Sequence, residues 1–281
     1  MRTGTGFIGY GSMGSMIVQG LLDNKCLQPK NVYISTRHPA TLTALLEKYP
    51  SVHVAQNNRV LARECNRVMI CTKPLDTVQV LSEISGDLHA DTHLVSIAAC
   101  LPLEQIARFF PGAVTRVVPS LTGEMSSGVT LLCHNAAVSR NAAQEVEDLF
   151  RALGNVVVID EENVDVATDL TSCGPALIAV LIEEFAHAAV RHSTLSEEQA
   201  HSLAVSTLSG TSRLLDEQGY PTEAILHRVA TPGGITEEGV KQLQSDMPRV
   251  YDTLIHRTLA KYGQRKTDVR AEADRLLGRN A

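Results

Sequence analysis

The sequence lacks several features that mark common functional classes. Basic residues are not in excess, because 25 Lys and Arg stand against 31 Asp and Glu, which gives a net charge of −6. Nucleic-acid-binding proteins normally carry a basic surface, so this balance argues against a nucleic-acid partner. The six cysteines form no C-x-x-C pair, and no histidine lies at metal-ligand spacing, so no metal site is predicted. We interpret the cysteines as reduced thiols of a cytoplasmic protein.

A convincing membrane-spanning segment is also missing. Residues 3 to 22 carry no charge and follow Arg2, as a signal peptide or a membrane span would. Six of these twenty residues are glycine, however, and no A-x-A cleavage site follows them. No other segment resembles a span, so we expect a soluble, cytoplasmic chain with no membrane partner.

The chain is long enough for about two domains, and its 44% hydrophobic and 20% charged residues are typical of a globular protein. Up to residue 160, short runs rich in Val, Ile and Leu alternate with helix-like stretches such as 16–22 and 41–49. Several runs are apolar throughout, as strands buried on both faces are, and the alternation predicts a parallel sheet. The predicted strands are residues 5–8, 32–36, 52–55, 67–72, 93–98, 113–118, 129–134 and 156–159.

Beyond residue 160 the apolar residues follow helical spacing. A stripe from Ala200 to Leu215 is preceded by Ser196 and Gln199, which form a capping-box pattern. A second stripe runs from Val250 to Tyr262, and the charged residues from Gln264 onward are predicted to form a solvated, fraying helix. We therefore expect an α/β fold over 1–160, followed by an all-helical domain over 161–281 whose broad apolar stripes favour dimerisation. A monomer whose helices pack on the first domain is the alternative. The motifs below give the first domain its expected role in dinucleotide binding and the second its expected role in substrate binding.

A G-x-G-x-x-G motif, Gly9 to Gly14, follows the first predicted strand and opens the first predicted helix. Gly9 permits a tight turn, Gly11 lets the backbone approach a pyrophosphate, and Gly14 lets the helix pack close to the sheet. The helix N-terminus then offers free N–H groups to the phosphates. In this context the motif predicts a dinucleotide, and a structural glycine turn is the alternative.

The segment Ser35-Thr36-Arg37-His38, at the end of the second predicted strand, indicates which dinucleotide binds. NAD sites place an acidic residue there to hold the ribose, and this segment has none. An arginine with two hydroxyls instead suits a 2′-phosphate. We expect NADP(H) to be preferred, with NAD(H) possible. The alternative interpretation of Arg37 is a solvated loop charge.

Three further motifs accompany this fingerprint: Thr72-Lys73-Pro74, the segment from Thr171 to Ala176, and the segment from Ala230 to Thr236. In order and spacing, the four segments resemble the pyrroline-5-carboxylate reductase family from residue 5 to about residue 262. The most specific motif is Pro-Gly-Gly-x-Thr at Pro232 to Thr236. The resemblance implies a Rossmann-type doubly wound domain, a helical dimerisation domain, and a homodimer or higher homo-oligomer. It also implies NAD(P)H-dependent reduction of a small cyclic imino acid, 1-pyrroline-5-carboxylate, to L-proline.

The resemblance implies roles for individual residues as well. The phosphate loop is Gly9, Gly11, Ser12, Met13 and Gly14. The 2′-phosphate site is Ser35, Thr36 and Arg37, and Asn58 is a further cofactor contact. The strand ends beside the nicotinamide carry Lys73, Pro74, Ala98 and Ala99. The loop that holds the substrate carboxylate is Thr231, Gly233, Gly234 and Thr236, with Thr236 as the catalytic residue.

The sequence departs from the family pattern at a few positions. Ser120 stands in the Val118 to Thr122 segment, where the family usually has Met-Pro-Asn-x-Pro, and Cys100 replaces a usual glycine. Cys173 lies in a usual Ser-Gly-Ser-Gly-Pro-Ala run, and Ile235 replaces a usual small residue or threonine. The combination is most similar to the late-competence branch called ComER. Three alternatives stay open: another small imino or keto acid as substrate, a regulatory nucleotide-binding paralogue with weak activity, and a β-hydroxyacid dehydrogenase, for which the catalytic lysine is missing.

The predicted chemistry needs few side chains. Hydride attacks an imine carbon most readily when the nitrogen is protonated, and a pyrroline takes that proton from water before binding. The protein then has to hold the ring, exclude water and bind the carboxylate. Amides of Gly233 and Gly234, with the Thr231 and Thr236 hydroxyls, supply anion contacts. The alternative role of Thr236 is to cap a helix that begins at Glu237.

Overall fold

The computed structural model describes residues 4–279, which divide into two compact units. The first unit contains the chain up to Cys173 together with the last segment from Thr258 onward, and the second contains Gly174–Arg257. The last helix therefore belongs to both units. The boundary expected between residues 160 and 161 stays a prediction.

An eight-stranded sheet forms the centre of the first unit, in the order β3-β2-β1-β4-β5-β6-β7-β8. Neighbouring strands are parallel except β6 and β7, which are antiparallel. The strand order reverses at β1, which lies between β2 and β4, and ligands of such sheets bind beyond the strand ends at this switch point. The strands are β1 (Gly4–Ile8), β2 (Val32–Ser35), β3 (His53–Val54), β4 (Cys65–Ile70), β5 (His93–Ser96), β6 (Ala113–Val118), β7 (Gly128–His134) and β8 (Gly154–Val158).

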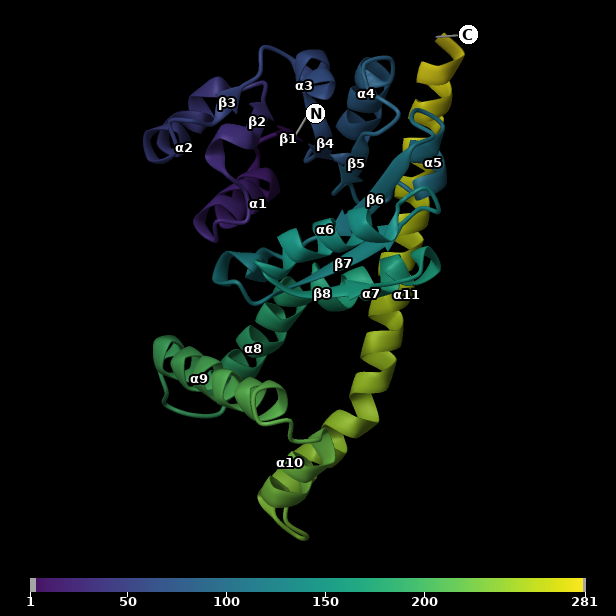
Figure 1. Cartoon of the computed structure of the whole chain (residues 1–281). Helices are drawn as coiled ribbons and strands as arrows, with labels where there is room; N and C mark the ends of the chain where they lie inside the picture. Colours follow the sequence, from purple (N-terminus) through teal and green to yellow (C-terminus); the bar gives the residue numbers. More distant parts are fainter. Residues whose placement is uncertain (1–3, 280–281) are drawn as a thin grey trace. The chain divides into compact units, whose positions relative to one another are not determined.

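Helices cover both faces of this sheet (Figure 1). One face packs against α1 (Ser12–Asp23), α2 (Thr43–Lys48) and α6 (Arg140–Arg151). The other packs against α3 (Asn58–Glu64), α4 (Pro74–Ile84), α5 (Leu103–Ala107), α7 (Val164–Thr171) and the end of α11 (Ile235–Arg279). Short 3-10 helices lie at Pro29–Asn31, Pro39–Leu42, Leu121–Met125 and Glu161–Asn163. The predicted Rossmann-type, doubly wound α/β fold is confirmed.

The described residues from Gln264 onward form a helix, as predicted, and many of them are exposed, but one face of this helix is buried, so the prediction of a fully solvated, fraying helix is wrong. Val269 and Ala273 are 1% and 0% exposed and join the same core cluster as α4 and α7. Because these two residues lie four positions apart, they share one face of the helix. In the sequence this narrow apolar stripe is hard to recognise, because charged residues surround it. The stripe from Val250 to Tyr262 belongs to this same helix, which continues through Pro248.

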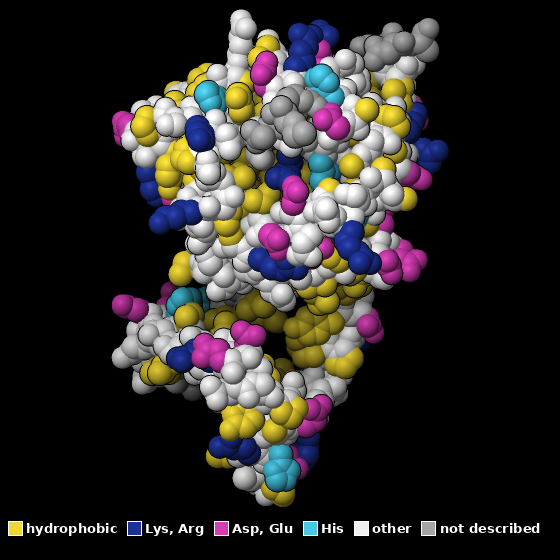
Figure 2. Space-filling view, in the orientation of Figure 1, with side chains coloured by type: hydrophobic (Ala, Val, Ile, Leu, Met, Phe, Trp, Pro, Cys, Tyr) yellow, Lys and Arg dark blue, Asp and Glu magenta, His cyan; other side chains and the backbone are white. Residues whose placement is uncertain are grey.

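The second unit consists of α8 (Gly174–Arg191), α9 (Glu197–Asp216), α10 (Thr222–Val229) and the part of α11 up to Arg257. The predicted capping box at Ser196 and Gln199 is present at the start of α9. The buried core of the second unit is small and consists of Ala186, Ala200 and Ala204, which join α8 to α9. Many large apolar side chains of this unit lie at the surface (Figure 2), among them Ile178, Val180, Leu181, Phe185, Leu203, Val205, Leu243, Val250 and Tyr251.

One helical stretch in the described part of the chain, Glu161–Arg191, is long and apolar enough to cross a membrane by length and composition. The expectation that no segment after residue 22 resembles a span overlooked this stretch. Charged residues limit the stretch, however, because Asp169 precedes and Glu183 follows its uncharged part, residues 170–182. That part is shorter than the about 20 apolar residues that a transmembrane helix needs.

Candidate functional site

A cavity of about 480 Å³ opens at the carboxyl ends of β1, β2 and β4, beside the switch point of the sheet. It brings together seven of the residues predicted to bind the cofactor: Gly9, Gly11, Ser35, Thr36, Arg37, Asn58 and Lys73. Ser12, Met13 and Gly14 continue from this lining into the first turn of α1. Pro74, Ala98 and Ala99 do not line the cavity, although Pro74 opens α4 and the two alanines follow β5.

The three glycines of the motif meet different steric demands. Gly9 has φ +99°, a left-handed conformation that favours glycine, and its N–H donates to the Ser35 carbonyl at 2.8 Å. A Cβ on Gly14 would lie 2.5 Å from the Gly9 carbonyl oxygen, so Gly14 is required for packing of the helix on the turn. A Cβ on Gly11 would meet nothing within 4 Å. The space above Gly11 is therefore open to a ligand rather than filled by the protein.

The N-terminus of α1 has the character of an anion site. Gly11 is its N-cap residue and provides no side chain to accept from the first N–H groups, and the first turn contains no acidic residue. The amides and the positive end of the helix dipole are therefore available to a pyrophosphate. These residues fit the phosphates of a dinucleotide.

Arg37 is an exposed loop charge that forms an ion pair. Its Nη2 donates to Oδ2 of Asp76, in the first turn of α4, at 3.2 Å. Asp76 lines the same cavity, as does Glu83 from the same helix. Sequence reasoning missed both carboxylates. Their spacing of seven residues places them on one face of α4, but the sequence alone does not show that this face meets Arg37.

A chain of hydrogen bonds fixes the floor of the cavity beside β2. Ser35 Oγ donates to Asn58 Oδ1 at 2.7 Å, and Asn58 Nδ2 donates to Glu83 Oε2 at 2.7 Å. The cavity wall also includes Cys71, and burial raises the pKa of its thiol to about 12. Cys71 is therefore protonated at neutral pH and is not a nucleophile.

Cys100, which follows the two alanines after β5, adopts φ +60°. This left-handed conformation explains why glycine suits the position better. The side chain is only 6% exposed, and burial, with the nearby Asp165 carboxylate, raises the pKa of the thiol. Cys100 is thus a buried, protonated thiol on a strained turn.

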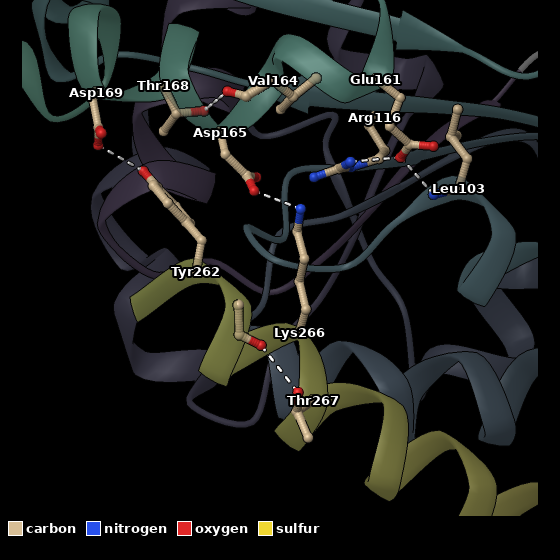
Figure 3. A network of polar contacts seen from close by, with 11 residues as sticks. Leu103, Arg116, Glu161, Val164, Asp165, Thr168, Asp169, Tyr262, Lys266 and Thr267 are labelled. Carbon is tan, nitrogen blue, oxygen red and sulfur yellow. Dashed lines mark hydrogen bonds and ion pairs between the residues drawn. The ribbon is translucent and has the colours of Figure 1, made fainter. Parts of the chain in front are cut away.

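A network of polar side chains joins α7 to the last helix within the first unit (Figure 3). Asp169 is 2% exposed and accepts hydrogen bonds from Thr258 and Tyr262, while Lys266 donates to Asp165. The Tyr262 hydroxyl also lies 3.6 Å from Cys173 Sγ. Burial raises the pKa of Tyr262, and the contact with Cys173 adds to that effect.

The loop from Thr231 to Thr236 lies in the second unit and is largely exposed. Gly233 adopts φ +72°, and its N–H donates to Glu237 Oε2 at 2.8 Å. The Gly234 N–H donates to the Thr231 carbonyl at 2.9 Å. The Gly233 amide, followed by Lys241, holds the pKa of Glu237 below its usual range. A carboxylate of the chain itself therefore binds one of the amides predicted to hold the substrate carboxylate.

The helix after this loop starts earlier than predicted. It begins at Ile235, so Thr236 lies within its first turn and is not the residue that caps a helix starting at Glu237. The role of Thr236 at the substrate site stays a prediction. Within residues 4–279, no group of three or more His, Cys, Asp or Glu side chains is placed to hold a metal ion.

The doubly wound sheet, the glycine turn and the uncapped α1 N-terminus define a Rossmann-type dinucleotide-binding unit. Comparison with family models agrees. Residues 5–100 match the model described as NADP oxidoreductase coenzyme F420-dependent, and residues 161–265 match pyrroline-5-carboxylate reductase dimerisation.

Individual relatives extend over nearly the whole chain. Pyrroline-5-carboxylate reductase 3 of Bacillus subtilis is 37% identical over 92% of this chain and 94% of its own. ComE operon protein 4 of the same organism is 30% identical over 92% of this chain and 94% of its own. A solved pyrroline-5-carboxylate reductase from Coxiella burnetii superimposes with a TM-score of 0.83, 26% identity and coverage of 96% and 99%. The chain therefore belongs to the pyrroline-5-carboxylate reductase family.

Proposed function

We propose that this chain catalyses the NAD(P)H-dependent reduction of 1-pyrroline-5-carboxylate to L-proline. The observation that carries the proposal is the open space above Gly11, at an uncapped helix N-terminus beside the switch point of the sheet. Family membership then selects the reaction from those that dinucleotide-binding units support.

In this proposal, a first segment, residues 1–160, binds the cofactor and a second segment, residues 161–281, binds the substrate. The first holds the cofactor: Gly9, Gly11, Ser12, Met13 and Gly14 contact the pyrophosphate, and Lys73, Pro74, Ala98 and Ala99 lie at the strand ends beside the nicotinamide. The second supplies the loop Thr231, Gly233, Gly234 and Thr236 for the substrate carboxylate. For that contact, Glu237 has to release the Gly233 amide that it now holds.

The reaction places modest demands on these side chains. A nicotinamide cofactor, when bound, would supply the hydride for the new C–H bond at the imine carbon, and the C=N double bond would become a single bond. The ring nitrogen enters already protonated and leaves as an amine, so no catalytic triad is needed. The loop orients the ring through its carboxylate, and the surrounding side chains exclude water.

NADP(H) is the proposed preferred cofactor, with NAD(H) also accepted. Arg37 and the Thr36 hydroxyl offer charge-assisted hydrogen bonds to a 2′-phosphate. The Ser35 hydroxyl donates its one proton to Asn58 Oδ1, so it has to turn away from Asn58 to donate to the phosphate as well. The cavity provides no carboxylate at the end of β2 itself to hold an unphosphorylated ribose.

A second copy of the chain is the proposed cover for the exposed apolar face of the second unit. The match to a dimerisation model over residues 161–265 supports this, as does the small core of the unit itself. The apolar stretch Glu161–Arg191 is then covered by protein rather than lipid, and the cytoplasm is the proposed location.

The direct test is to add pyrroline-5-carboxylate to the purified chain and follow the loss of reduced nicotinamide absorbance. We expect turnover with this substrate to exceed turnover with larger cyclic imines and with keto acids. Normal cofactor binding without turnover would reject the proposal, and faster turnover of another imine would change the substrate.

A regulatory role is the second candidate, favoured by the similarity to ComE operon protein 4. Complementation of a proline auxotroph separates the two. Rescue by the parent, lost in Gly11→Asp, would support the enzyme, whereas a folded, nucleotide-binding chain that does not rescue would support the regulator.

A further inference from the structure

Two carboxylates of α4 line the dinucleotide cavity together with the residues proposed to bind the 2′-phosphate. Asp76 and Glu83 lie seven residues apart, which is two helical turns, so they share one face of the helix. The cavity lining contains two fixed cationic side chains, Arg37 and Lys73, and the titratable His38, against these two carboxylates. A site that binds only a dianionic phosphate is expected to carry an excess of positive charge, and the two carboxylates offset the positive charge of this cavity.

Each carboxylate is engaged with a proposed cofactor contact. Asp76 accepts from Arg37 at 3.2 Å, and Glu83 accepts from Asn58 at 2.7 Å. The Arg37 side chain is 78% exposed and that of Asp76 is 33% exposed, so solvent and a ligand reach Arg37 readily, while Asp76 is more enclosed by the cavity wall. A 2′-phosphate bound by Arg37 therefore comes close to the Asp76 carboxylate.

We propose that Asp76 determines cofactor discrimination by limiting the preference for NADP(H) over NAD(H). The inference rests on the proposed function, because it concerns the same cavity. With NAD(H) bound, the ion pair between Arg37 and Asp76 stays intact. With NADP(H) bound, Arg37 turns to the phosphate, and a phosphate group with nearly two negative charges lies beside an unpaired carboxylate.

The expected size of the effect follows from the exposure of these groups. An exposed ion pair contributes little, so breaking it changes affinity only slightly. The repulsion between carboxylate and phosphate in a partly solvated cavity corresponds to about a five- to tenfold change in affinity.

The test is titration calorimetry of the full chain with NADP⁺ and with NAD⁺, which needs no turnover. Asp76→Asn removes the charge and is expected to raise the ratio of NADP⁺ to NAD⁺ affinity by about five- to tenfold. Asp76→Glu keeps the charge and is expected to keep the ratio within about twofold of the parent. Glu64→Gln is the matched control, because Glu64 is exposed and directly precedes β4, at the strand end away from the cavity.

The outcomes separate this inference from the proposed function. If the parent binds both dinucleotides and Asp76→Asn leaves the ratio unchanged, the inference is overturned while the function stands. An equal rise in Asp76→Glu or in Glu64→Gln would also overturn it, because the effect would not come from charge at this position. If the parent binds neither dinucleotide, the proposed function and the inference both fail.

Discussion

Tyr262 of the last helix donates a hydrogen bond to Asp169 of α7 at 3.1 Å, and the two residues lie 93 positions apart in the chain. Asp169 is almost fully buried and also accepts from Thr258. A buried carboxylate is stable only when it is hydrogen-bonded, so these contacts compensate its loss of water. The returning segment of α11 is thereby fixed to the first unit by polar as well as apolar contacts.

Tyr262→Phe removes one donor from Asp169 and is expected to lower the free energy of unfolding by about 1–3 kcal/mol. Chemical denaturation of the parent and the variant measures this. Tyr33→Phe is the control, because Tyr33 lies on β2 of the first unit and does not contact Asp169, and it is expected to change stability by less than about 0.5 kcal/mol. Equal stability of the parent and Tyr262→Phe would show that the hydrogen bond contributes nothing.

His93 is expected to make the protein acid-sensitive. Burial, with the nearby positive charge of Arg67, lowers the pKa of His93 to about 4, and its Nε2 lies 2.7 Å from Thr115 Oγ1. In the unfolded chain His93 therefore binds a proton as the pH falls below about 6.5, whereas in the folded chain it stays neutral until the pH is much lower. Stability from this group is complete above pH 6.5 and is lost as the pH falls toward about 4.

The measurement is the free energy of unfolding of the parent and of His93→Gln between neutral and mildly acidic pH. The parent is expected to lose up to about 3 kcal/mol more than the variant over this range. His192→Gln, at an exposed position, is expected to follow the parent. A parallel loss in the parent and in His93→Gln would contradict the assignment.

The sequence was sufficient for the parts of the structure that local patterns specify. The strand, glycine turn and helix around Gly9 to Gly14 are contiguous, and the capping box at Ser196 requires only residues within one turn. The partners of Arg37 and Asp169 could not be predicted in this way. Arg37 meets Asp76 39 positions away, and only the folded sheet brings the two together.

The end of α11 shows a second limit. Val269 and Ala273 give too narrow an apolar stripe to distinguish a buried helix from a solvated one, and their burial depends on the core cluster that includes α4 and α7. The start of α11 was also misplaced, because Thr236 is a good capping residue but the chain turns at Gly233 and enters the helix at Ile235.

Gly11 and Gly14 are expected to respond oppositely to substitution. Gly11→Asp has space and provides an N-cap side chain, so stability is expected to stay within about 1 kcal/mol of the parent, while dinucleotide affinity is lost through repulsion of the phosphates. Gly14→Ala places a Cβ 2.5 Å from the Gly9 carbonyl oxygen and is expected to lower the free energy of unfolding by about 1–3 kcal/mol.

Thermal unfolding and fluorescence titration with NADPH separate the two effects. A Gly11→Asp chain that still binds NADPH as the parent does would place the cofactor elsewhere. A Gly14→Ala chain as stable as the parent would show that the turn relaxes more easily than the structure indicates.

Glu237→Ala is expected to improve substrate binding. Its carboxylate holds the Gly233 amide proposed for the substrate, so removing it is expected to lower KM for the imino acid by about three- to tenfold with little change in kcat. Glu238→Ala is the matched control, because Glu238 pairs with Lys241 and does not contact the loop amide. An unchanged or higher KM in Glu237→Ala would mean that Glu237 supports the loop rather than competes for it.

Isotope transfer tests the central claim most directly. The chain is incubated with pyrroline-5-carboxylate and NADPH that carries deuterium at the transferable C4 position, and the product is examined by mass spectrometry. We predict L-proline with one deuterium on the former imine carbon, formed by the parent and not by Gly11→Asp. Absence of product, or proline without deuterium, would contradict the account.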